Sequence, residues 1–190
     1  MAEKIDAGSA EQAGQVKHVD VCYFSWRGAT KKVAEQIAES LQEHRVRIIQ
    51  IRPFRNYPYI VWLLMSFIPG FGVKSGFDKP ASGIMFLCLP KWTFNCPPIT
   101  YFLKKVDLAG KIIFLAVTYG GFDEKRYVES LKKSLEKKGA EVKDTILVKR
   151  RHLEENQEKV AEMISNWAIG CITQLGSKGN GENRETEEKE

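Results

Sequence analysis

Residues 19–41 read VDVCYFSWRGATKKVAEQIAESL and hold a strand, a short loop and a helix in direct succession. Val19 to Phe24 form an apolar run that predicts a buried strand. In the segment 30–44, apolar residues recur every four positions at Val33, Ile37 and Leu41, which predicts an amphipathic helix packed on a sheet. Because the strand leads straight into its covering helix, this stretch favours a βαβ unit and a parallel sheet.

The same alternation of short apolar runs and helical periods continues along the chain. Residues 83–89 and 111–117 are nearly continuous apolar runs, as the central strands of a parallel sheet are. Further strands are expected at 46–51 and 142–148, and further helices at 98–106, 123–138 and 154–171. Asp123 is expected to cap the helix that Gly139 ends. The pattern predicts a three-layer α/β domain over residues 19–172, built on a doubly wound, five-stranded parallel sheet.

Three segments stand outside this pattern. Residues 1–18 and the acidic tail 173–190 are expected to be disordered. Residues 56–73, NYPYIVWLLMSFIPGFGV, form an insertion without a charge, in which only Tyr59–Ile68 is a clean apolar run, too short to span a bilayer. We expect the insertion either to pack on the sheet and cap its ligand-binding end, or to present an apolar patch to a partner subunit or a membrane interface.

The charge of the chain is unevenly distributed. Residues 1–18 carry a net −1 and residues 182–190 a net −3, so residues 19–181 carry +9 although the whole chain carries +5. A basic body favours acidic partners, phosphate-bearing ligands or an anionic membrane surface. Nucleic acid is not an expected partner, because the chain has no recognisable nucleic-acid module and no arginine-rich run beyond Lys149-Arg150-Arg151.

The four cysteines are scattered and form no metal-type spacing, so neither a metal site nor an iron–sulfur cluster is expected. Cys22 and Cys88 fall in the most apolar strands and are interpreted as small buried side chains. The first residues lack the apolar run of a signal peptide, and a reducing cytoplasmic location is therefore predicted.

Loops that follow three of the expected strands carry the candidate binding residues. In a doubly wound sheet, ligands bind beyond the carboxyl ends of the strands, near the point where the strand order reverses. The first loop, residues 25–30, leads into a helix N-terminus, where backbone N–H groups and the helix dipole favour an anion such as phosphate. Its members are Ser25, Trp26, Arg27, Gly28, Ala29 and Thr30.

The second and third loops add aromatic side chains and glycines that suit a planar ring. Trp92 is the first candidate for stacking on such a ring, and Tyr119 the next. The second loop contributes Pro90, Lys91, Trp92, Thr93, Phe94 and Asn95. The third contributes Thr118, Tyr119, Gly120, Gly121 and Phe122.

The runs YFSWRGATKKVAEQIAESL and LPKWTFNCPPITYFLKKVDLAGKIIFLAVTYGGF resemble the flavodoxin superfamily, especially the flavodoxin half of flavodoxin-ferredoxin proteins, over residues 19–170. The resemblance implies noncovalent FMN, with the first loop on the phosphate and the other two around the isoalloxazine. It also implies electron transfer through the flavin, sometimes to quinones, without catalytic acid–base residues of the protein's own. Arg27 departs from the pattern, since the family places a small hydroxyl residue there, and it could pair with the phosphate or swing to solvent.

Other functions lack their key residues or stay open as alternatives. The chain has no P-loop, Rossmann or esterase-elbow signature, and Leu89-Pro90 stands where a receiver domain needs an acidic residue. The alternatives are a flavin-free interaction module of the same fold and an FMN-dependent quinone or flavin reductase. The expected partner is a redox protein, acidic and ferredoxin-like in the leading case. Quinone, a membrane surface reached through 56–73 and a second copy of the chain are the further candidates.

Overall fold

A five-stranded parallel sheet runs through the computed structural model, which describes residues 16–121 and 123–177. The strand order is β2-β1-β5-β6-β7, and all four neighbouring pairs are parallel. The strands are β1 (His18–Tyr23), β2 (Arg45–Gln50), β5 (Ile84–Pro90), β6 (Ile112–Tyr119) and β7 (Glu141–Lys149). The expected doubly wound, five-stranded α/β architecture is confirmed.

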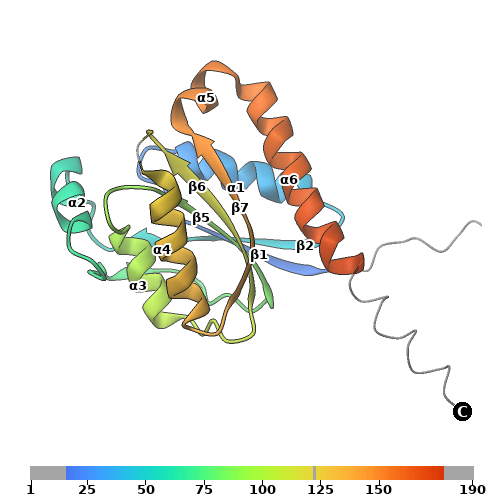
Figure 1. The fold of residues 1–190 in the computed structure, drawn as a ribbon, viewed down its shortest axis with the longest axis horizontal. Coiled ribbons are helices and arrows are strands. Elements are labelled where there is room, and N and C mark those ends of the chain that lie inside the picture. Colours follow the sequence, from blue (N-terminus) through green and yellow to red (C-terminus); the bar gives the residue numbers. More distant parts are fainter. Residues whose placement is uncertain (1–15, 122, 178–190) are drawn as a thin grey trace, which may run out of the picture.

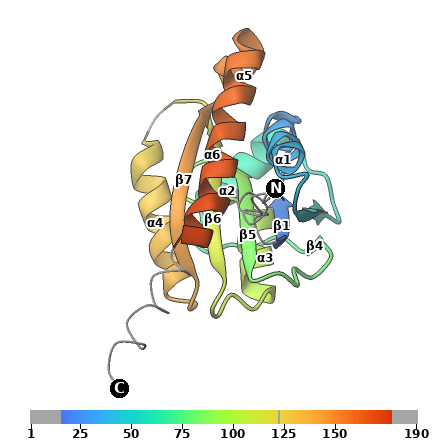
Figure 2. The same ribbon diagram turned by 90° about the vertical axis from the view of Figure 1, so that its right-hand side faces the viewer.

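Helices cover both faces of the sheet (Figures 1 and 2). One face packs against α1 (Ala29–Ser40), α5 (Arg150–Glu155) and α6 (Gln157–Ser177). The other packs against α3 (Pro97–Lys105) and α4 (Glu124–Glu136). Within the described residues, no helix combines the length and apolar character needed to cross a membrane.

The central strands are apolar along their whole length because they feed two cores at once. Successive side chains of a strand point to opposite faces. In β5, Leu87 enters the core under α3 and α4, whereas Phe86 enters the core under α1 and α6. In β6, Leu115 and Phe114 divide in the same way.

The strand order reverses beside β1, which lies between β2 and β5. The amino ends of the strands lie away from the binding loops. There, the buried Asp20 accepts hydrogen bonds from Arg47 Nε at 2.9 Å and from the backbone N–H of Ser82 at 2.8 Å. These bonds tie the β1–β2–β5 group together at the end away from the loops. The loops can therefore carry the binding groups while the sheet stays fixed.

The insertion forms a separate loop-and-helix segment between β2 and β5, and its two ends are paired with each other. Two short antiparallel strands, β3 (Arg52–Pro53) and β4 (Ser75–Gly76), close its base. Between them, α2 (Tyr59–Ser66) buries Trp62 and Ser66 against the body. The helix of the insertion begins with the apolar run at Tyr59 and ends at Ser66, two residues before that run does.

Two further helix predictions need correction. The single helix expected at 154–171 is two helices, separated by Asn156, and the second continues to Ser177. Asp123 stands at the N-cap of α4 with φ of 51°, but its side chain makes no capping hydrogen bond. Gly139 follows α4 with φ of 82°, a left-handed conformation suited to glycine. The disorder expected at both termini falls mainly on 1–15 and 178–190, which lie outside the described residues, as does Phe122.

Candidate functional site

A small cavity lies where the loops after β1, β5 and β6 meet. Its volume is about 170 Å³. Residues from all three loops, from the insertion and from the start of α5 line it, namely Ser25, Trp26, Arg27, Ala29, Thr30, Tyr59, Pro90, Trp92, Thr118 and Arg150. The structure therefore brings eight of the predicted site residues together at one point, the position that the reversal of strand order predicts.

The first loop places the N-terminus of α1 at this cavity. Gly28 is the N-cap, with φ of 88°, a backbone conformation that residues other than glycine rarely adopt. Because glycine has no side chain, no side-chain cap occupies the N-terminus of the helix. The first backbone N–H groups of a helix have no partner within the helix, so they remain available to a ligand. Thr30 and Thr118, both buried, share a hydrogen bond of 2.7 Å between their hydroxyl oxygens, which fastens the loop to the end of β6.

Ser25 has a buried hydroxyl oxygen without a hydrogen-bond partner in the described structure. A buried polar group that is left unsatisfied costs about 1–3 kcal/mol, so native proteins rarely keep one without a reason. Because Ser25 lines the cavity, a ligand with an acceptor oxygen would satisfy its hydroxyl. The donor set at this end of α1 therefore fits a phosphate group.

Arg27 is exposed, yet it lines the cavity and packs against two aromatic rings. Its guanidinium carbon lies 4.6 Å from the centroid of Trp26 and 5.7 Å from that of Tyr59. The two rings are themselves 5.1 Å apart. Stacking on aromatic faces keeps an arginine near the rings while its N–H groups stay free for an anion.

Arg150 is the residue that the sequence analysis did not assign to the site. It follows β7 directly, and its Nη2 lies 2.6 Å from the position that a Cβ on Gly120 would occupy. Among the described residues, neither Arg150 nor Arg27 has a carboxylate within 4.0 Å. The cavity thus carries two positive charges that no described acidic group neutralises, which favours an anionic ligand.

The sequence did contain an indication that Arg150 belongs to the site, because the basic run Lys149-Arg150-Arg151 follows the expected fifth strand. Parallel strands bring their carboxyl ends to one edge of the sheet, so a basic residue after the edge strand β7 could have been placed near the other loops. Tyr59 had no such signal, because nothing in the insertion indicates which side of its helix faces the cavity.

The second loop divides between the cavity and the insertion. Trp92 is only 8% exposed and packs against Phe24 and Trp62, with ring centroids 5.6 and 5.7 Å away. Thr93 and Asn95 turn away and hydrogen-bond to Ser66 and to the backbone oxygen of Ile68. The ring of the exposed Phe94 lies 6.0 Å from that of Phe67.

The remaining predicted residues that the structure describes do not line the cavity. These are Gly28, Lys91, Thr93, Phe94, Asn95, Tyr119, Gly120 and Gly121. Lys91 donates its backbone N–H to the oxygen of Thr118 at 2.7 Å, which joins the second loop to the third. Tyr119 is half-buried, and the two glycines after it are exposed.

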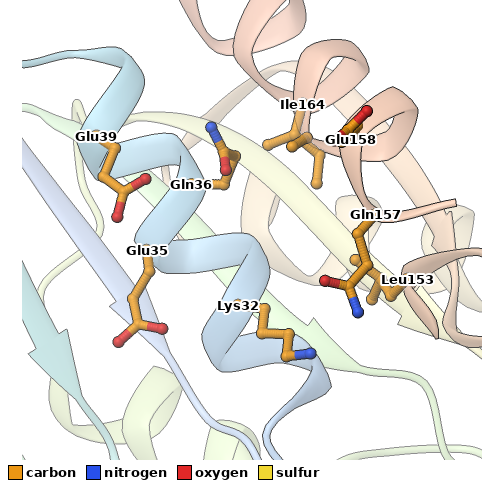
Figure 3. Close-up of a pocket in the computed structure, with 9 residues that line it drawn as sticks. Lys32, Glu35, Gln36, Glu39, Leu153, Gln157, Glu158 and Ile164 are labelled. Carbon is orange, nitrogen blue, oxygen red and sulfur yellow. The ribbon is translucent and has the colours of Figure 1, made fainter.

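A larger groove of about 340 Å³ lies elsewhere, between α1 and α6 (Figure 3). Acidic side chains from both helices line it, among them Glu35, Glu39 and Glu158. Carboxylates repel a phosphate, and none of the three predicted loops reaches the groove. The smaller, basic cavity is therefore the better candidate site.

Comparison with known proteins gives one close sequence relative and many structural ones. An uncharacterized protein of Archaeoglobus fulgidus is 45% identical over 149 residues, which cover 78% of this chain and 97% of that protein. No family model matches the chain. A flavoprotein in complex with FMN from Lactobacillus acidophilus superposes with a TM-score of 0.60 at 16% identity, over 74% of this chain and 97% of that one. Flavodoxin 2 from Bacillus cereus in its oxidised form gives 0.57 at 18% identity, over 83% and 99%. A flavodoxin from the domain Archaea gives 0.53 at 16% identity, over 83% and 98%.

Proposed function

Since the chain belongs to one family with the uncharacterized Archaeoglobus fulgidus protein and has a flavodoxin-like fold, we propose that it binds FMN noncovalently and transfers electrons through the flavin. The structural neighbours include a flavoprotein in complex with FMN. The observation that carries the proposal is the cavity at the N-terminus of α1, which is lined by two arginines and the unpartnered hydroxyl of Ser25.

The terminal phosphate of FMN matches the donors at this cavity. Ser25 would donate its unsatisfied hydroxyl to a phosphate oxygen, and the first N–H groups of α1 would do the same. Arg27 and Arg150, which both line the cavity, would add charge-assisted hydrogen bonds. Riboflavin lacks this phosphate and would leave all of these donors unused.

The cavity would hold the phosphate end of the ligand and not the whole flavin. Pockets for drug-sized ligands measure about 300–1,000 Å³, and this one is smaller, with about 170 Å³. The ring would therefore lie over the loops beside the cavity. Phe24 and Trp62 already occupy much of the surface of Trp92, which leaves Tyr59 and Tyr119 as the more exposed aromatic partners.

FMN supplies the redox chemistry when it is bound. The residues of this chain bind it, hold its phosphate and place two arginines near it. Because both arginines would pair with the phosphate, their charges would mainly serve binding.

The test compares FMN with riboflavin on the same protein. Titration followed by flavin fluorescence is expected to show FMN binding at least about a hundredfold more tightly, since each hydrogen bond to a charged group contributes about 1.5–3 kcal/mol. Equal affinities for the two flavins would contradict the proposal.

A second candidate is an FMN-dependent quinone or flavin reductase. The observation that favours it is Tyr59, through which the insertion forms one wall of the cavity. Oxidation of a nicotinamide cofactor with quinone as acceptor, catalysed by the FMN-loaded protein alone, would favour the reductase. Electron exchange that requires a second redox protein would favour the carrier.

A further inference from the structure

The outer face of α2 and the turn after it expose an unusual number of large apolar side chains. Ile60 is 59% exposed and Leu64 61%, although both lie on a helix whose inner side is buried. We call the exposed set the apolar tip; it consists of Ile60, Leu64, Phe67, Ile68, Phe71 and Phe94. An exposed cluster of this kind marks an interaction site in most proteins that carry one.

The apolar tip cannot bury itself by turning inward. Trp62 already fills the inner face of α2, and the buried hydroxyl of Ser66 bonds to the backbone oxygen of Leu63 at 2.7 Å and to Thr93. After the helix, Lys104 donates to the backbone oxygen of Gly70 at 2.7 Å and holds the turn in place. A helix that is apolar all round requires an apolar environment on both sides, and here only one side has it.

The stretch of chain that contains the tip has few acidic residues. Residues 44–106 contain nine lysines or arginines, and Asp78 is their one acidic residue. Three of these cations, Arg52, Arg55 and Lys74, lie at the two ends of the insertion, and a fourth, Lys104 on α3, bonds to the backbone oxygen of Gly70 in the turn after α2. Among the described residues, none of the four forms a salt bridge. A partner surface is therefore expected to be negatively charged.

The shape of this region favours a lipid surface over a protein. Figure 1 shows α2 at the edge of the fold, apart from the helices that cover the sheet, so the tip projects outward. A protruding tip needs a matching hollow in a protein partner, whereas a fluid headgroup layer accepts it directly. Lysine and arginine beside inserted apolar side chains gain about 1 kcal/mol each from anionic lipids.

We propose that the apolar tip inserts into the interface of an anionic membrane, with Arg52, Arg55, Lys74 and Lys104 facing the lipid phosphates. Tyr59 begins the same helix and lines the proposed flavin cavity, so a bound membrane would lie beside that site. The inference does not depend on flavin, because the tip and the cations belong to the polypeptide.

The test is flotation of the full chain with vesicles, with and without FMN. Vesicles of phosphatidylcholine with about one-third phosphatidylglycerol are expected to carry the protein, whereas phosphatidylcholine alone is not. Ile60→Ser with Leu64→Ser is expected to weaken binding at least about tenfold, because two exposed apolar anchors are lost. The matched control is Met163→Ser with Ile169→Ser, which removes comparably exposed side chains from α6 and is expected to bind as the wild type does.

A second pair of variants tests the charge. Arg55→Glu with Lys74→Glu is expected to abolish binding to the anionic vesicles, whereas Lys125→Glu with Lys133→Glu on α4 leaves most of it. Three results would overturn the proposal: no flotation of the wild type with anionic vesicles, equal loss in tip and control variants, or a dimer in solution that Ile60→Ser with Leu64→Ser dissociates. Vesicle binding without FMN binding would contradict only the proposed function, which keeps the two failures distinguishable.

Discussion

Ser25 has a buried hydroxyl oxygen without a hydrogen-bond partner, so a Ser25→Ala substitution should affect stability differently from most buried serine substitutions. Most buried serines lose a hydrogen bond when they are changed to alanine, but Ser25 has none to lose in the protein alone. Ser25→Ala is therefore expected to leave the free energy of unfolding unchanged or slightly higher, while FMN binding weakens by about 1.5–3 kcal/mol. Chemical denaturation and FMN titration of the same variant measure the two effects.

Ser82 is the control for this experiment, because its hydroxyl has a hydrogen-bond partner within the protein. Its hydroxyl donates to the backbone oxygen of His18 at the far end of the sheet. Ser82→Ala should lower the free energy of unfolding by about 1 kcal/mol and leave FMN affinity intact. A Ser25→Ala variant that loses stability but binds FMN normally would show that this hydroxyl serves the fold and not a ligand.

Gly120 controls the position of Arg150 in the structure. A Cβ at this position would lie 2.6 Å from Nη2 of Arg150, which must then move away from the cavity. Gly120→Ala is expected to weaken FMN binding by roughly the 1.5–3 kcal/mol of one charge-assisted hydrogen bond, with the fold retained because only the end of a flexible side chain is displaced. Isothermal titration with FMN measures the loss.

A double variant separates this mechanism from a direct effect of the methyl group. If Gly120→Ala acts by moving Arg150, then adding it to Arg150→Gln should cost little more, since the two changes remove one interaction. Gly83→Ala is the control, because a Cβ there meets nothing within 4 Å. Additive losses would place the effect of Gly120 elsewhere.

Helices and strands differ in how far the sequence determines them. The central strands could be predicted to within two residues, because their apolar runs serve two cores and end at polar or proline residues. The break at Asn156 could not, since the apolar period of the last helix continues on both sides of it. The short pair β3 and β4 was also beyond prediction, because two-residue strands leave no periodic signal.

In the candidate site, the positions of the loops could be predicted from the sequence, but the orientations of their side chains could not. The order of the strands places the three loops together, and that order follows from the alternation of strands and helices. Which side chains of a loop face the cavity depends on neighbours far along the chain. Thr93 and Asn95 turn toward the insertion because Ser66 and Ile68 supply their hydrogen-bond partners there.

The two faces of α2 predict opposite effects on stability. Trp62 is fully buried between Phe24, Tyr57 and Trp92, whereas Leu64 on the same helix is 61% exposed. Trp62→Ala is expected to lower the free energy of unfolding by about 3–5 kcal/mol through the cavity it leaves. Leu64→Ala should change it by less than about 0.5 kcal/mol. Urea denaturation measures both, and similar losses would mean that α2 packs differently.

The four thiols report on the opening of the molecule as a whole. Cys22 and Cys96 lie in one core and Cys88 and Cys171 in the other, and burial raises the pKa of each, that of Cys171 to about 12. Because an unfolded thiol ionises near pH 8.5, these groups stabilise the fold fully below that pH and less as the pH rises above it. We expect slow alkylation by iodoacetamide at pH 8 until denaturant unfolds the chain, and a lower urea midpoint at pH 10 than at pH 7. Fast labelling of any one cysteine in the native protein would contradict this.

The charge of the whole molecule leads to a prediction about its redox partner. Residues 19–181 carry +9, and two of the arginines counted there, Arg27 and Arg150, line the proposed flavin cavity without a salt bridge to any described carboxylate. We propose that the partner is an acidic, ferredoxin-like protein, because a basic carrier is steered toward anionic surfaces. Steering of this kind acts on the association rate and is screened by salt.

Electron-transfer rates between the FMN-loaded protein and an acidic ferredoxin should therefore fall steeply as ionic strength rises from about 0.01 to 0.3 M, where the screening length drops from about 30 Å to below 10 Å. Arg27→Gln with Arg150→Gln is unsuitable for this test, since it would also affect FMN. Arg52→Gln with Arg55→Gln leaves the cavity intact and should flatten the salt profile in solution without vesicles, where lipid does not occupy these side chains. Lys125→Gln with Lys133→Gln on α4 removes the same number of charges and should change the profile less, because steering depends on charge near the docking face. A flat profile in the wild type would exclude an electrostatically steered partner, and equal effects of the two variants would mean that net charge acts without a defined docking face.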